Sequence, residues 1–141
     1  MSSTSTRDCA QAATSFVTAF NERDWDAMRS LLAPDCVYEE IAKPLRRVQG
    51  AEAITEAFQG WARAVGELRG RVSNLVAAED KVAMEVALEG PMKAAFGDFS
   101  PTGRAPAARG SFFFSFEDGI VQELRLYFDK LALFQILGIR P

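Results

Sequence analysis

Apolar side chains recur every three or four residues in three stretches of the first half of the chain, the spacing of one helix face. They predict helices over residues 8–21, 24–33 and 51–67. Pro34 ends the second, because proline disfavours helical geometry in the residue before it. The apolar positions are Ala12, Ala13, Phe16, Val17 and Phe20, then Trp25, Met28, Leu31 and Leu32, then Ile54, Ala57, Phe58, Trp61, Ala62 and Val65.

Extended segments fill most of the remaining chain. Alternating or continuous apolar runs predict strands over residues 36–41, 71–78, 81–89, 107–117 and 120–129. Asp118-Gly119 is the strongest hairpin signal, because these residues accept the positive φ of a two-residue turn. Residues 90–106, rich in glycine and proline, predict a loop long enough to edge a pocket. The order of elements predicts an α+β domain, with three N-terminal helices on one face of a curved, mostly antiparallel sheet.

Length and charge narrow the class of protein. The 141 residues suit one domain over residues 8–141, after a polar leader over residues 1–7 that we expect to be disordered. A net charge of −3 offers no basic stripe for nucleic acid. No apolar run approaches the roughly 20 residues of a membrane span, and no secretory signal is visible. We therefore expect a cytoplasmic protein with neither nucleic acid nor membrane as a partner.

The chain contains no histidine, and this absence limits its chemistry. It excludes Ser-His-Asp and Cys-His catalysis and histidine-ligated metals. Two cysteines, Cys9 and Cys36, are too few for a disulfide framework. We expect no metal and no cofactor, so acid–base work would fall to carboxylates, tyrosine, lysine or water.

One acid stands in an unusual place. Asp129 lies within the apolar run that ends the chain. A carboxylate there must be paired, solvated by a cavity or shifted towards its protonated form, and enzymes use all three arrangements. The alternative is that Asp129 caps a following helix.

Several short motifs occur in the order typical of one family. They are Val37-Tyr38-Glu39-Glu40, Gly50-Ala51-Glu52-Ala53-Ile54, Pro101-Thr102-Gly103-Arg104, Gly119-Ile120-Val121 leading to Tyr127-Phe128-Asp129, and Gln135-Ile136-Leu137-Gly138. With these motifs the chain resembles the SnoaL-like polyketide cyclase branch of the nuclear transport factor two-like superfamily, whose relatives include ketosteroid isomerase and limonene epoxide hydrolase. The likeness covers nearly all of residues 8–139 and implies a cone-shaped fold with an apolar cavity.

The resemblance also implies roles for single residues. In SnoaL-type cyclases the acid on the final strand is the general acid/base of an aldol closure, and Asp129 occupies that place. In the epoxide hydrolase, a tyrosine and an asparagine two residues apart hold the attacking water. Tyr38 matches the tyrosine, whereas Glu40 replaces the asparagine. A middle strand offers Glu85 but lacks the hydrolase's arginine, which weighs against that mechanism.

Strand alternation gives the last strand two faces. One carries Arg125, Tyr127 and Asp129, and the other carries Leu124, Leu126 and Phe128. The resemblance implies that the Asp129 face lines the cavity, which leaves the apolar set outside, where a homodimer would cover it. By the same logic Glu85 shares the cavity with Asp129, so that the two carboxyl groups split their pKa values. Alternatively, Glu85 is simply solvated.

The remaining candidates would contact substrate. Tyr38 would donate a hydrogen bond to a carbonyl or developing oxyanion, with Glu40 beside it on the same face. The other candidates are Phe58, Trp61, Phe114, Arg125 and Tyr127. Core packing is the alternative for the first three, and a structural ion pair with Asp129 is the alternative for Arg125.

These features support three hypotheses about function. The first is a small cofactor-free lyase or isomerase, similar to polyketide cyclases, that acts on a hydrophobic carbonyl compound by carboxylate acid–base catalysis. The second is an epoxide-hydrolase-like enzyme in which Asp129 activates water. The third is a non-catalytic module for ligand binding or dimerisation, since a fold does not determine a function.

Overall fold

The computed structural model describes residues 5–42, 44–64, 66–89 and 108–129. The helices are α1 (Thr6–Glu22), α2 (Trp25–Ser30) and α3 (Ala51–Ala64), and the strands are β1 (Leu32–Ile41), β2 (Arg46–Gln49), β3 (Arg69–Ala78), β4 (Lys81–Glu89), β5 (Ala108–Glu117) and β6 (Ile120–Phe128). The predicted loop over 90–106 and the motif over 135–138 lie outside these residues. In the described part of the chain, no helix is long and apolar enough to cross a membrane.

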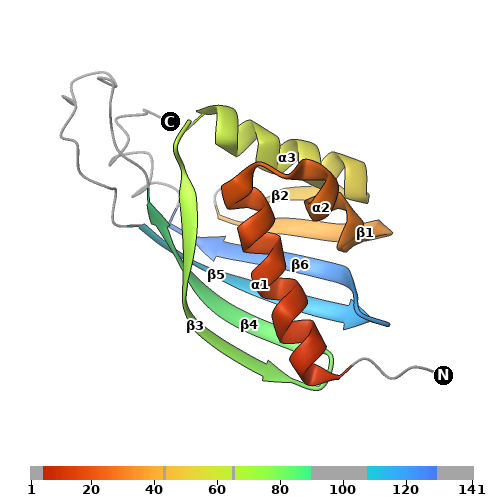
Figure 1. Cartoon of the computed structure of the whole chain (residues 1–141). Helices are drawn as coiled ribbons and strands as arrows, with labels where there is room; N and C mark the ends of the chain where they lie inside the picture. Colours follow the sequence, from red (N-terminus) through yellow and green to blue (C-terminus); the bar gives the residue numbers. More distant parts are fainter. Residues whose placement is uncertain (1–4, 43, 65, 90–107, 130–141) are drawn as a thin grey trace.

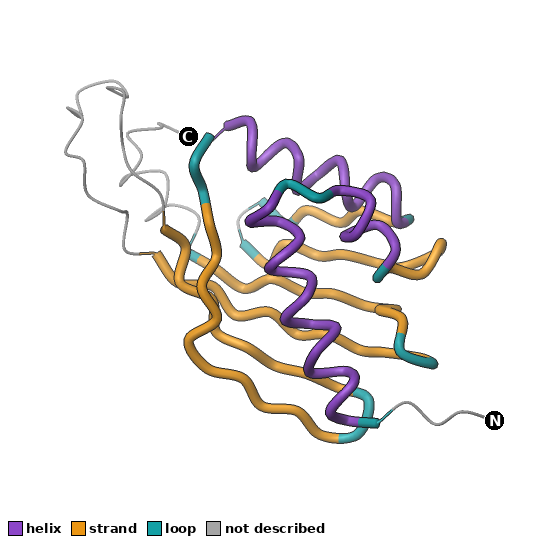
Figure 2. Tube along the Cα trace, viewed as in Figure 1, coloured by secondary structure: helices purple, strands orange, loops and turns teal. Residues whose placement is uncertain are grey.

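The six strands form one open sheet in the order β2-β1-β6-β5-β4-β3. Neighbouring strands are antiparallel except for β1 and β6, which run parallel. The three helices lie on one face of this curved sheet, with α1 crossing it and α3 above β1 and β2 (Figures 1 and 2). The predicted α+β fold is therefore confirmed, and the sheet has an inner face under the helices and an outer face without them.

The core is rich in phenylalanine and lies between α1, α3 and the inner face of the sheet. Phe16 of α1 is 1% exposed, and its ring meets Phe58 of α3 and Phe114 of β5 edge to face at centroid distances of 5.2 and 5.7 Å. Such edge-to-face pairs add stability beyond the burial of their area. The helices are therefore fixed against the sheet by interlocking aromatic rings.

Element boundaries differ from the predictions where short-range signals compete. α1 begins at Thr6 because Ser5 and Asp8 form a reciprocal capping box, so the helix includes part of the predicted leader. α2 ends at Ser30, and β1 already begins at Leu32. The predicted turn is confirmed, with φ of 51° at Asp118 and 78° at Gly119.

Candidate functional site

The two faces of β6 are the reverse of the sequence expectation. Leu124 and Leu126 are 0% and 6% exposed on the inner face, whereas Arg125 and Tyr127 are exposed on the outer one. The helices need an apolar sheet face to pack against, and Leu124 and Leu126 provide it. The predicted orientation of Arg125, Tyr127 and Asp129 is therefore wrong. The same finding removes the stated reason for a homodimer, which itself stays a prediction.

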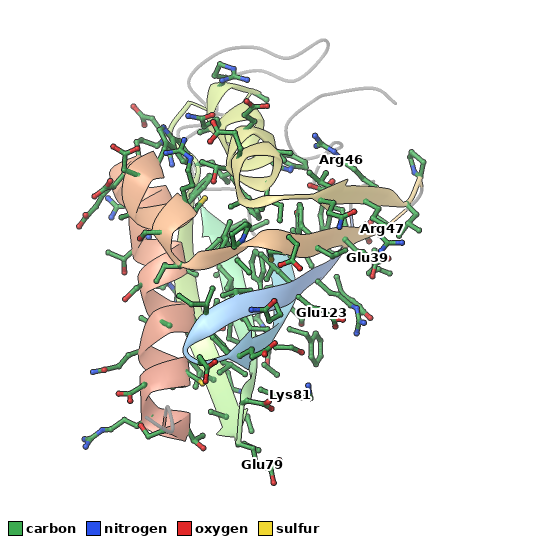
Figure 3. The ribbon with its side chains drawn as sticks, turned by 90° about the vertical axis from the view of Figure 1, so that its right-hand side faces the viewer. Glu39, Arg46, Arg47, Glu79, Lys81 and Glu123 are labelled. Atoms are coloured by element: carbon green, nitrogen blue, oxygen red, sulfur yellow. The ribbon has the colours of Figure 1, made fainter. Side chains whose placement is uncertain are left out.

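Arg125 and Tyr127, which were expected to line the cavity, make their contacts on the outer face of the sheet. Arg125 pairs with Glu39 at 3.3 Å and with Glu123 at 3.4 Å, and Figure 3 shows both acids at this surface. The ring of Tyr127 packs on Phe113 with centroids 5.4 Å apart. Asp129, directly after β6, is exposed. These residues do not line a buried cavity.

Glu85 is also on the outer side of the sheet. Its neighbours in β4, Met84 and Val86, are 2% and 1% exposed and point into the core. Asn74 of β3 donates a hydrogen bond to Glu85 Oε1 over 3.3 Å. The expected carboxyl pair of Glu85 and Asp129 within one cavity is therefore wrong, because alternation along β4 gives the inner face to its large apolar residues.

A different acid occupies the interior. Glu40 of β1 is 1% exposed, and Tyr38, two residues before it, is 0% exposed. The Tyr38 hydroxyl donates to Glu40 Oε2 over 2.8 Å, and Trp61 Nε1 of α3 donates to the same oxygen over 3.0 Å. The prediction that Tyr38 and Glu40 share a face is thus confirmed. Both donors act on one carboxylate oxygen, so they fix the orientation of the Glu40 side chain.

Tyr38 is suited to donate a proton in a hydrogen bond but not to lose it. Burial, followed by the charge and hydrogen bond of Glu40, raises the pKa of Tyr38 well above its ordinary value. Trp61 offers only an N–H donor. Within this triad, Glu40 therefore provides the hydrogen-bond acceptor, and Tyr38 and Trp61 provide the donors.

The second oxygen of Glu40 has no such partner in the described part of the chain. Glu40 Oε1 is inaccessible to solvent, and among the described residues nothing donates a hydrogen bond to it. Arg46 of β2 approaches the carboxylate with Nη1 at 3.9 Å from Oε2, and its side chain is 48% exposed. A buried carboxylate oxygen left without a donor is costly in a folded protein, and such atoms occur at sites that bind or react with ligands.

An apolar pocket lies beside this cluster. It is lined by Phe16, Val17 and Phe20 of α1, Phe58 and Trp61 of α3, Leu68, Gly70 of β3, Val86 and Leu88 of β4, Phe112 of β5, and Leu126 and Phe128 of β6. Every lining residue is apolar or glycine, apart from the indole N–H of Trp61. The pocket is therefore suited to a hydrophobic ligand.

Three contacts connect the pocket to Glu40. Trp61 belongs to its wall and donates to Glu40. Phe58 belongs to the same wall and lies against the Tyr38 ring at 4.9 Å. Leu126, a third wall residue, is the register partner of Glu40 across the parallel β1–β6 pair. Trp61, Phe58 and Leu126 thus belong both to the pocket wall and to the immediate surroundings of Glu40.

The structure thus separates the predicted substrate contacts into three groups. Phe58 and Trp61 line the pocket, and Glu40 lies directly behind them. Phe114 is 1% exposed and packs in the core between Phe112 and Phe116. Arg125 and Tyr127 lie outside. Sequence reasoning missed Arg46, because its strand has only four residues and no alternating pattern.

The comparisons with known proteins agree with this fold. A family model described as SnoaL-like polyketide cyclase matches residues 10–137. No curated protein matches the chain.

Solved structures share the architecture at low sequence identity. IdmH from Streptomyces antibioticus, provisionally described as a polyketide cyclase, has a TM-score of 0.78 and 21% identity over 93% of this chain and 99% of that chain. AclR from Streptomyces galilaeus, provisionally described as a hydroxylase, has a TM-score of 0.77 and 23% identity over 97% and 89%. An LEH-like epoxide hydrolase of M. tuberculosis has a TM-score of 0.71 and 20% identity over 93% and 90%. At these identities the likeness shows the fold alone.

Proposed function

The chain belongs to the SnoaL-like polyketide cyclase family, and on this premise we propose that it is a cyclase- or isomerase-type enzyme acting on a hydrophobic carbonyl compound. Glu40 is the proposed proton acceptor, in place of Asp129. The observation that carries the proposal is the buried Glu40 carboxylate beside an apolar pocket. Tyr38 and Trp61 hold its Oε2, and no described residue donates to its Oε1.

The proposed reaction begins at the carbon next to the substrate carbonyl. Glu40 Oε1 takes a proton from this carbon, and the electron pair of the broken C–H bond forms an enolate. The enolate carbon then either attacks a second carbonyl group, which closes a ring, or takes the proton back at another position, which isomerises the substrate. In both routes the proton held by Glu40 returns to the product, so no external oxidant or reductant is needed.

The surroundings of Glu40 support this role physically. An apolar pocket excludes water from the reacting carbon and strengthens the interactions of the charges beside it. Tyr38 and Trp61 hold one oxygen in place, so the other presents its lone pairs in a fixed direction. General bases placed in this way accelerate proton transfer by roughly 10²–10⁴-fold.

Deuterium exchange provides the test. Phenylacetone is a small hydrophobic ketone, and proton NMR in D2O follows the loss of its benzylic protons. We expect wild-type protein to accelerate the exchange and Glu40→Gln to lower that acceleration by roughly 10²–10⁴-fold. Glu39→Gln is the matched control, because this neighbouring acid faces outward and pairs with Arg125.

Two results would contradict the proposal. Exchange by Glu40→Gln at the wild-type rate, with circular dichroism unchanged, would remove Glu40 from catalysis. Exchange in wild-type protein no faster than in buffer, together with measurable ketone binding, would favour a ligand-binding module instead.

A further inference from the structure

The proposed reaction creates a negative charge on the substrate oxygen, and the donors beside Glu40 are already engaged. The sequence assigned the stabilisation of this charge to Tyr38. The Tyr38 hydroxyl proton is instead directed at Glu40 Oε2, and so is the Trp61 N–H. Neither can donate to a substrate oxygen without withdrawing a hydrogen bond from the buried Glu40 carboxylate, and a buried charged group left short of donors is destabilising.

In the part of the chain that the structure describes, Arg46 is the remaining polar group that reaches this site. It is the register partner of Glu40 across β1 and β2, and β2 is an edge of the sheet. Its Nη1 lies 3.9 Å from Glu40 Oε2, inside ion-pair range but beyond a hydrogen bond. Among the described residues, Glu40 is the only ion-pair partner of Arg46, and no hydrogen bond engages its guanidinium. The five N–H donors of an arginine are therefore available to a ligand.

The side chains of Glu40 and Arg46 differ strongly in their exposure to solvent. Glu40 is 1% exposed and Arg46 is 48% exposed, so the guanidinium extends from the solvent-facing edge of the sheet to the buried carboxylate. Figure 3 shows Arg46 on the side of β2 towards α3, away from Arg47 and Glu39. Arg47 pairs in register with the outward-facing Glu39. Neighbouring arginines of one short strand thus face different surroundings.

We infer that Arg46 binds an anionic oxygen of the ligand and serves as the oxyanion-binding residue of this site. The inference rests on the proposed function and names the group that completes it. Before reaction, the guanidinium faces the charge of Glu40. When Glu40 takes up the proton, the negative charge moves to the substrate oxygen, and the fork of Arg46 donors hydrogen-bonds to it.

An equilibrium binding measurement tests this role without relying on turnover. Phenylacetate and phenylacetone have the same apolar body, but only phenylacetate carries an anionic oxygen at neutral pH. Tryptophan fluorescence titrations report binding, because Trp61 lines the pocket. We expect Arg46→Gln to weaken phenylacetate binding by about 10- to 100-fold, while phenylacetone binding changes less than about twofold.

Matched variants separate this inference from the proposed function. Arg47→Gln is expected to change neither ligand's affinity. Arg46→Lys keeps the charge but loses the fork, so an intermediate loss of phenylacetate binding is expected. Glu40→Gln is expected to strengthen phenylacetate binding, because a nearby like charge is removed.

The binding measurements can refute the inference about Arg46 whatever the result of the deuterium-exchange experiment. Glu40→Gln protein without a preference for phenylacetate over phenylacetone, including protein that binds neither ligand, would refute it, because this variant lacks the like charge that opposes the anion. So would equal losses of both ligands in Arg46→Gln when circular dichroism and the thermal midpoint are unchanged. If phenylacetate selectivity depends on Arg46 but Glu40→Gln still exchanges deuterium normally, the proposed function fails and the inference stands.

Discussion

Glu39 and Glu40 are adjacent residues of one type, yet strand alternation gives them opposite environments. The side chain of Glu39 is 26% exposed on the outer face, where Arg125 pairs with it. Glu40 is 1% exposed under α3 and is held by Tyr38 and Trp61. A carboxylate moved by one position along a strand thus changes from a partly exposed, ion-paired group into a buried carboxylate oriented by two donors. Residue type alone does not identify the buried acid; the face of the sheet does.

The largest expected effect on stability comes from replacing adjacent residues of β6 that lie on opposite faces of the sheet. Leu124 is 0% exposed, so Leu124→Ala is expected to lower the free energy of unfolding by about 2–5 kcal/mol through lost burial and a cavity. Arg125→Ala removes ion pairs of a half-exposed side chain and is expected to cost at most about 1 kcal/mol. Urea unfolding of both variants measures the difference.

A cost of Arg125→Ala as large as that of Leu124→Ala would contradict the assigned faces of β6. If the Arg125→Ala cost grew with protein concentration, the outer face would instead be covered by a second copy of the chain. That result would support the predicted homodimer on a surface other than the one first expected.

The second comparison uses the only two tyrosines of the chain. Tyr38→Phe removes a donor from a buried carboxylate and is expected to lower the free energy of unfolding by about 1–3 kcal/mol. Tyr127→Phe keeps the ring contact with Phe113 on the outer face and is expected to change stability by less than about 0.5 kcal/mol. Thermal and urea unfolding measure both. A cost of Tyr38→Phe below about 0.5 kcal/mol would show that the Tyr38–Glu40 hydrogen bond contributes little to stability.

The apolar pattern of the sequence predicted the elements that bury one face, but it predicted the other features less well. The spacing of apolar residues predicted three helices and five of the six strands, since burial of one face leaves a periodic trace. Alternation also showed that Tyr38 and Glu40 lie together. Alternation separated the two faces of β6, and only the preference of leucine for the core indicated which of them is inside. The family resemblance decided that question wrongly, against the simple preference of Leu124 and Leu126 for the core.

Strand β2 and its residue Arg46 were not predicted from the sequence, for the same physical reason. β2 is four residues long and mostly exposed, so its extended conformation follows from pairing with β1 rather than from a buried apolar face. Arg46 reaches Glu40 only because the β1–β2 register sets them opposite each other. Pairing between strands is not visible in the local sequence, so the adjacent Arg46 and Arg47 gave no sign of which one would lie beside Glu40.

The smallest expected effect is a pH dependence of the stability that the inner-face Tyr38 supplies. Because burial and Glu40 raise the pKa of Tyr38 well above its ordinary value near 10, the folded protein keeps this proton while the unfolded chain loses it above about pH 10. The stability supplied by Tyr38 is therefore complete below that pH and declines as pH rises. Between about pH 8 and about pH 10.5, the stability difference between wild type and Tyr38→Phe should shrink by about 0.8 kcal/mol.

The comparison with Tyr38→Phe isolates this term, because every other titrating group, including both buried cysteines, is present in both proteins. Urea unfolding at the two pH values measures it. The Tyr127→Phe variant contains Tyr38 as its only tyrosine, so its absorbance near the tyrosinate band should stay constant through this range while the protein is folded. A tyrosinate signal that rises in folded Tyr127→Phe around pH 10, with an unchanged stability difference, would mean that the Tyr38 hydroxyl is not held beside a buried carboxylate, and Glu40 would lose its distinction from Glu39.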